Sequence, residues 1–162
     1  MAIRKIIQKG NPILKMKCHP VTKFDDRLGK ILDDMRETLL DANGVGLAAP
    51  QIGLVRRYAL VWDVNQEEEG KDPVIYELIN PEIIAQSEET EVAAEGCLSV
   101  PGKYGTVERP CWVKVRARDR HGNFFEVEGT GIVARCFCHE LEHLDGHIFT
   151  EKVIEYLEPE EN

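Results

Sequence analysis

The chain has 162 residues, of which 43% are hydrophobic, and this length suits one domain that buries a core without disulfides. It carries 20 basic and 29 acidic residues, which gives a formal net charge of -9 and a pI near 5.1. Binding to nucleic-acid phosphates requires clustered lysine and arginine, so this charge argues against direct nucleic-acid readout. The apolar runs are too short to cross a bilayer, which argues against a membrane protein.

The cysteines and the opening residues indicate a reducing compartment. Arg4 and Lys5 precede only a short apolar stretch, which is not the pattern of a secretory signal. An odd number of cysteines without a C-x-x-C pair is typical of free thiols, so we expect a cytoplasmic protein. The five cysteines are Cys18, Cys97, Cys111, Cys136 and Cys138.

The first half of the chain predicts one helix and one strand. Apolar residues recur at spacings of three and four over 25–42, which is typical of an amphipathic helix. A glycine-rich apolar loop over 44–51 follows, and then an apolar strand at about 57–64. Residues 66–72 include three consecutive glutamates and a glycine, and we expect them to form a solvated hairpin tip.

The second half predicts several strands and a second helix. Residues 130–145 have a helical pattern that ends at Gly146, and this helix is expected to be buried on most sides. The acidic last ten residues are expected to form a short helix with a frayed tail. The expected strands span 75–80, 82–86, 111–118 and 124–128, of which the last two form a hairpin.

The second predicted helix carries an H-E-x-x-H motif at residues 139–143. Two histidines four residues apart lie on one face of a helix, so both imidazoles can reach the same metal ion. Glu140, between them, is placed to act as a base on water. For the motif alone, incidental histidines on a solvated helix face remain an alternative.

A metal site of this kind needs a third protein ligand. One known zinc-protease extension of the motif requires a histidine at the position where this chain has Phe149, so it does not fit. Another takes a glutamate from a later helix, but few residues follow His143 in this chain. The remaining candidate is Cys97, which lies between Gly96 and a turn that ends at Pro101. Without a metal, Cys97 would instead be a small buried hydrophobic residue, as single free cysteines often are.

Three motifs, in this order and spacing, resemble peptide deformylase. They are G-V-G-L-A-A-P-Q over 44–51, E-G-C-L-S over 95–99 and H-E-x-x-H over 139–143. The resemblance covers roughly the whole chain and includes its opening residues 10–14. It implies a metal-dependent hydrolase that removes the formyl group from the N-terminal formylmethionine of nascent proteins and releases formate. Its substrates would be N-formylmethionyl peptides and nascent chains.

The resemblance also implies the metal ligands and the catalytic groups. Glu140 would be the acid-base, and the side chain of Gln51 with the backbone N–H of Leu98 would form an oxyanion hole. The expected ion is Fe²⁺, one per chain, with Zn²⁺, Ni²⁺ or Co²⁺ able to occupy the same site, because one thiolate and two imidazoles suit all four. The implied ligands are Cys97, His139 and His143.

Further residues are implied to contact the substrate. Val45 and Gly46 would pair through their backbone with an extended peptide, which suits an enzyme that accepts many nascent chains. Gly96 would let a ligand approach the backbone closely. The residues implied to line the methionine pocket are Ile132 and Cys136, with Tyr104 at its rim. Without the resemblance, each of these would be interpreted as an ordinary core residue.

Some positions depart from the pattern of the family. Cys138 stands where glutamine is common, and Glu142 where aspartate is usual. Arg135 stands where many members have an apolar residue, so it either faces solvent or tunes the preference for the residue after methionine. The acidic end of the chain puts in doubt the ribosome docking that a basic C-terminal helix provides in some members, and a transient ribosome contact remains an expectation.

Together these patterns predict an α+β fold, with antiparallel or mixed strands wrapped around a central helix that carries H-E-x-x-H. We expect residues 1–150 to form a single catalytic metallohydrolase domain and residues 151–162 to form an acidic C-terminal segment. Two competing functions remain open at this point. One is an H-E-x-x-H endopeptidase, and the other is a metal-binding or interaction protein that has lost the chemistry.

Overall fold

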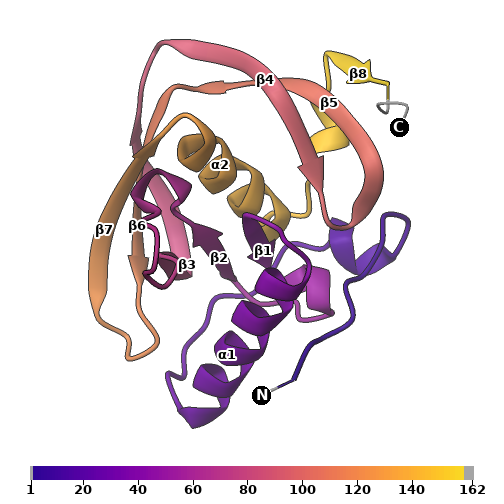
Figure 1. The fold of residues 1–162 in the computed structure, drawn as a ribbon. Coiled ribbons are helices and arrows are strands. Elements are labelled where there is room, and N and C mark those ends of the chain that lie inside the picture. Colours follow the sequence, from indigo (N-terminus) through magenta and orange to yellow (C-terminus); the bar gives the residue numbers. More distant parts are fainter. Residues whose placement is uncertain (1, 159–162) are drawn as a thin grey trace.

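A computed structural model describes residues 2–158. The described part is α+β, as the sequence predicted, with a long helix enclosed by strands on several sides (Figure 1). Its two α-helices are α1 (Asp26–Asp41) and α2 (Ile132–Leu144). Four short 3₁₀ turns connect other elements: Pro12–Lys15, Ala49–Ile52, Val64–Gln66 and Phe149–Glu151. Within the described residues, neither α-helix combines the length and apolarity that a membrane crossing needs.

The larger sheet has five antiparallel strands in the order β1-β2-β3-β6-β7. Its strands are β1 (Gly46–Ala48), β2 (Tyr58–Trp62), β3 (Ile75–Gln86), β6 (Trp112–Arg118) and β7 (Phe124–Thr130). β6 alternates buried and more exposed residues, which is the pattern that predicted it. The short strand β1 lies inside the segment that the sequence predicted as a loop. The prediction missed it because its three residues are all buried and show no alternation.

The two strands expected over 75–80 and 82–86 are one continuous strand, β3. Pro81, which lies between the two expected ranges, lacks a backbone N–H. In the structure this residue lies where the register between β3 and β6 shifts, between Ile79 and Glu82. A local irregularity of this kind tolerates proline, so the strand bends and continues.

A smaller sheet is formed by β4 (Thr90–Cys97), β5 (Val100–Pro110) and β8 (Glu155–Leu157), in that order. β4 and β5 form a long hairpin that arches over α2 (Figure 1). The sequence did not predict this hairpin, because its strands are largely exposed and show little apolar alternation. The expectation of a helix in the last ten residues was wrong over 155–157, where β8 pairs with β5. Residues 159–162 of the acidic end lie outside the described residues.

α1 closes one side of the molecule. Asp25 caps its start by accepting a hydrogen bond from the backbone N–H of Leu28, at 3.1 Å. Its buried apolar face packs on residues of β1, β2 and β3 in one core cluster. This packing holds the segment after the helix, which contains β1, against the center of the fold. The helix bounds agree closely with the predicted 25–42.

α2 is the buried center of the fold. Only its first residue, Ile132, and the half-buried Glu142 escape full burial, which confirms the predicted central helix. Its apolar side chains pack on Val61 of β2 and on Val113 and Val115 of β6. The helix ends as predicted, because Gly146 adopts the left-handed conformation at φ 84°. A helix held on most sides offers a rigid support for reactive side chains.

Candidate active site and metal centre

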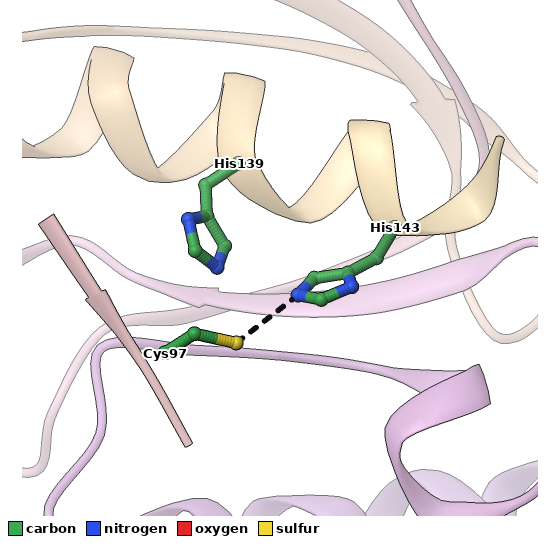
Figure 2. Close-up of side chains that lie close together, drawn as sticks. All are labelled: Cys97, His139 and His143. Carbon is green, nitrogen blue, oxygen red and sulfur yellow. Dashed lines mark hydrogen bonds between the residues drawn. The ribbon is translucent and has the colours of Figure 1, made fainter. Parts of the chain in front are cut away.

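Three side chains with metal-ligating atoms meet between α2 and the end of β4. The ligand atoms of Cys97, His139 and His143 all lie within 4.8 Å of one another. Figure 2 shows both histidines projecting from α2 toward the cysteine, whose Sγ lies 3.3 Å from Nε2 of His143. One thiolate and two imidazoles, gathered this closely, fit a divalent transition metal with coordination positions left for water or substrate.

Two distant segments bring these ligands together. His139 and His143 are one helical turn apart on α2, so they lie on the same face. Cys97 is the last residue of β4 and pairs with Val100 across the tight turn into β5. The chain reversal at this turn directs the thiol toward the helix, which the sequence could only suggest from the adjacent Gly96 and Pro101.

Glu95 orients one of the histidines. Its Oε1 lies 2.9 Å from Nδ1 of His139, so the other ring nitrogen faces the cluster. Burial by itself would raise the pKa of Glu95, but hydrogen bonds from His139 and Arg109 outweigh it and lower that pKa to about 2. The guanidinium of Arg109 donates to both carboxylate oxygens, at 2.8 and 3.0 Å. Glu95 is therefore a buried carboxylate held by charged partners.

The pKa values of the two histidines shift in opposite directions. Burial, followed by the charge on His139, lowers the pKa of His143 well below its usual range. Burial also opposes a charge on His139, but Glu140, Cys97 and Glu95 outweigh it and raise the pKa of this residue. A neutral imidazole such as that of His143 is ready to bind a metal, whereas a metal at His139 would displace a proton.

Glu140 lies beside the cluster and is almost fully buried, at 4% exposure. Burial raises its pKa to about 7. Its Oε2 lies 3.9 Å from Nε2 of His139, while its Oε1 has no hydrogen-bond partner among the described residues. A carboxyl group whose pKa lies near neutrality can both accept and return a proton, so Glu140 has the properties of an acid-base.

Gln51 lies beside the cluster, on the 3₁₀ turn Ala49–Ile52. Its side chain is buried, and its Oε1 accepts a hydrogen bond from the backbone N–H of Ala48 at 2.9 Å. Its Nε2 donates to Ser99 at 3.1 Å and lies 3.5 Å from Sγ of Cys97. The side-chain amide is therefore held by Ser99 beside the thiol of Cys97, where it could donate a hydrogen bond to an oxyanion.

A cavity of about 450 Å³ opens onto the cluster. It is lined by all the site residues named from the sequence except His143, which is fully buried and lies 3.3 Å from Sγ of Cys97. Its mouth is bordered by exposed apolar side chains, of which Ile132 is 58% and Tyr104 is 53% exposed. The predicted site residues that line it are Val45, Gly46, Gln51, Gly96, Cys97, Leu98, Ile132, Cys136, His139 and Glu140.

Two glycines allow close approach inside this cavity. A Cβ at Gly46 would lie 2.7 Å from Sγ of Cys136 and would also meet the carboxylate of Glu140. A Cβ at Gly96 would lie 2.5 Å from the ring of Tyr104, across the β4–β5 hairpin. At both positions a side chain would displace a neighboring side chain that lines the cavity.

The model of the polypeptide deformylase family matches residues 3–158, which is nearly the whole chain. The chain belongs to this family. Its members remove the formyl group from N-terminal formylmethionine, so this deformylase is a metal-dependent amide hydrolase that acts on formylated nascent peptides and releases formate. The resemblance predicted from three sequence motifs is thus confirmed.

Relatives and solved structures agree with this assignment. The deformylase is 50% identical to the peptide deformylase of Caldicellulosiruptor bescii over 161 residues, covering 99% of this chain and 92% of the relative. It is 48% identical over 160 residues to the enzyme of Finegoldia magna, covering 99% and 95%. The crystal structure of the Thermotoga maritima peptide deformylase superposes with a TM-score of 0.84 at 39% identity, covering 94% of this chain and 99% of that one.

Sequence reasoning gave no role to Glu95 or Arg109, although Glu95 was part of the second motif. A carboxylate two residues before a candidate ligand was the available signal, because ligating histidines commonly donate their second nitrogen to such a group. Arg135 was left open between a solvent-facing and a tuning role. In this deformylase it is buried, at 5% exposure, and lines the cavity, so it does not face solvent.

The other two departures from the family pattern lie away from the cavity. Cys138 lines a separate groove on the far side of α2, and burial raises the pKa of its thiol to about 11. Glu142 accepts hydrogen bonds from Arg109 and Lys152, each at 2.6 Å. Cys138 and Cys136 line different hollows and face different sides of α2, as two residues two positions apart on a helix do.

Proposed function

We propose that this chain carries out deformylation in the cavity beside α2, with Cys97, His139 and His143 holding one divalent metal ion. The observation that carries the proposal is the meeting of these three ligand atoms next to a buried carboxylate with a free oxygen. The native ion in this proposal is Fe²⁺, and Zn²⁺, Ni²⁺ or Co²⁺ can replace it, since the donor set suits all of them.

The formylated peptide enters as an extended strand. Val45 and Gly46, at the start of β1, offer backbone groups that pair with it irrespective of its side chains. The methionine side chain then occupies the apolar part of the cavity beside Ile132 and Cys136. Cys136 is held in place there, because its Sγ donates to the backbone carbonyl of Val45 at 3.3 Å. Gly96 keeps the opposite wall clear for the peptide backbone.

Hydrolysis uses one water molecule and two proton transfers. When bound, the metal supplies Lewis-acid chemistry that lowers the pKa of water and polarizes the formyl carbonyl. Glu140 accepts a proton from the water molecule as the water oxygen attacks the formyl carbon. The amide of Gln51 and the backbone N–H of Leu98 donate to the carbonyl oxygen as it gains negative charge. Glu140 passes the proton to the departing nitrogen as the C–N bond breaks, which yields formate and a free N-terminal amine.

The proposal extends to the setting in which the enzyme works. It acts in the cytoplasm on nascent chains, with a transient contact to the ribosome and without direct readout of nucleic acid. Residues 1–150 form the catalytic domain, and residues 151–162 form an acidic segment. The net charge of -9 favors a ribosome contact through protein or through the nascent chain rather than through RNA.

The test is formate release from a short formyl-methionyl peptide, with protein prepared anaerobically in Fe²⁺. We expect rapid formate release from this peptide and none from its acetylated analogue, because an acetyl methyl group crowds the site beside Gly46. Cleavage of unformylated peptides at internal bonds would instead support an endopeptidase. One bound metal per chain without formate release, with iron, nickel or cobalt, would contradict the proposed roles of the site residues.

A further inference from the structure

Arg135 makes an unusual set of contacts for an arginine in a helix. It lies one turn before His139 on α2, and its side chain is buried. One guanidinium nitrogen donates to Glu95 Oε2 at 2.8 Å and to the backbone carbonyl of Val107 at 2.7 Å. The other terminal nitrogen donates to the carbonyl of Glu91 at 3.1 Å, and a longer contact of 3.4 Å reaches the carbonyl of Ala93.

These acceptors all belong to the hairpin that carries Cys97. Glu91, Ala93 and Glu95 are on β4, and Val107 faces Ala93 across the ladder on β5. Arg135 itself is on α2, together with both histidine ligands. The guanidinium therefore ties the helix that supplies two ligands to both strands of the hairpin that supplies the third.

Arg109 does not duplicate this connection. It also reaches α2, through Glu142, but that carboxylate is partly exposed and is shared with Lys152. Arg135 instead donates to backbone carbonyls of the hairpin, and the position of a backbone carbonyl does not change with a side-chain rotamer as that of the Glu142 carboxylate does. Removing its side chain would take one of two donors from Glu95 Oε2, which would keep only Arg109, and would also remove the buried hydrogen bond to the carbonyl of Val107. Losing such bonds is costly in a dry interior.

We propose that Arg135 is a positioning residue, which sets the distance between Cys97 and the two histidine ligands and so tunes metal affinity. The inference rests on the proposed metal site. Arginine suits the role because its planar group donates in several fixed directions, whereas the ammonium group of lysine is a compact point charge. The same tie fixes one wall of the substrate cavity, which Arg135 lines.

The experiment is a titration of metal-free protein with Co²⁺, followed by visible absorption, which reports both affinity and thiolate coordination. We expect Arg135→Met to bind Co²⁺ roughly 10- to 100-fold more weakly, with an altered thiolate-to-cobalt band. Arg135→Lys keeps a charge beside Glu95 but loses the planar fork, so its affinity should lie between those of Arg135→Met and the wild type.

The matched control is Arg120→Met. Arg120 makes three charged hydrogen bonds, to Glu77 at 2.6 and 2.9 Å and to Asp33 at 2.8 Å, and it lines no part of the cavity. This variant loses an ion-pair network of similar size. We therefore expect its thermal stability to fall while its Co²⁺ affinity and spectrum stay within about twofold of the wild type.

Three outcomes would overturn the inference. The first is a folded Arg135→Met variant whose Co²⁺ affinity and spectrum equal those of the wild type. If Arg135→Met does not fold, as judged by circular dichroism, Arg135→Lys is the variant to test. Wild-type Co²⁺ affinity and spectrum in Arg135→Lys would then overturn the inference. A wild-type protein that binds Co²⁺ without a thiolate band would instead refute the proposed metal site, and the inference with it.

Discussion

Glu140 shows how burial changes the acidity of one side chain. Desolvation raises its pKa to about 7, whereas a carboxyl group in water titrates near 4.5. Gly46 makes this burial feasible, because its lack of a side chain lets β1 lie against the carboxylate.

Replacing Glu140 should separate metal binding from catalysis. Glu140→Gln keeps the size of the side chain but cannot accept a proton, so we expect kcat for formate release to fall by about 10²- to 10⁴-fold. Metal content should be unchanged, because Glu140 is not one of the three clustered ligands. Formate release and bound metal are measured on the same preparation. A rate near that of the wild type would disprove the acid-base role.

At the scale of elements, Glu95 connects β4 with α2. It is 6% exposed and contacts Arg109, Arg135 and His139 within 3.0 Å. A buried carboxylate with such partners is strongly coupled to folding, because protonation removes its charge from all of them at once. The hairpin that the sequence did not predict is therefore anchored by charge as well as by backbone pairing.

The lowered pKa of Glu95 gives a stability change with a defined sign. Its folded-state pKa of about 2 lies below the ordinary value of 4.5, so its stabilization is present above pH 4.5 and is lost as pH falls toward 2. Metal-free wild-type protein should lose about 2 kcal/mol of unfolding free energy between pH 6 and pH 3 relative to Glu95→Gln. Urea unfolding at several pH values measures this. Parallel pH profiles for the two proteins would refute it.

At the scale of the whole molecule, a bound metal would join parts of the chain that are far apart in sequence. Cys97 and His143 are 46 residues apart and belong to the small sheet and to the central helix. A ligand that binds only the folded state stabilizes it according to its concentration and affinity. The metal would therefore act as a cross-link between the hairpin and the core.

Removal of the metal should lower the melting temperature. With metal at a thousand times its dissociation constant, the stabilization is about 4 kcal/mol, which corresponds to roughly 10 °C for a chain of this size. Differential scanning calorimetry with metal and with a chelator measures the difference. Cys97→Ala should show a much smaller metal-dependent shift. Equal melting temperatures with and without metal in the wild type would contradict a site built from both parts.

Much of the architecture was predictable from local patterns. The spacing of apolar residues predicted α1 and α2 nearly to their ends, and alternation predicted β6. The β4–β5 hairpin was missed, because most of its side chains are exposed and its stability comes from backbone pairing and from buried charges. β8 was missed for a related reason, since three exposed residues carry no apolar pattern.

The sequence by itself determined the spacing of the two histidines and of Glu140 on one helix, because a helix places residues four apart on the same face whatever surrounds it. It also determined the family, through three motifs whose order and spacing are independent of any coordinates. Only the tertiary structure decided that Cys97 meets those histidines and that Arg135 turns inward to the hairpin. These contacts join residues about 30 to 45 positions apart, so they depend on how the strands fold over the helix, which no local pattern encodes.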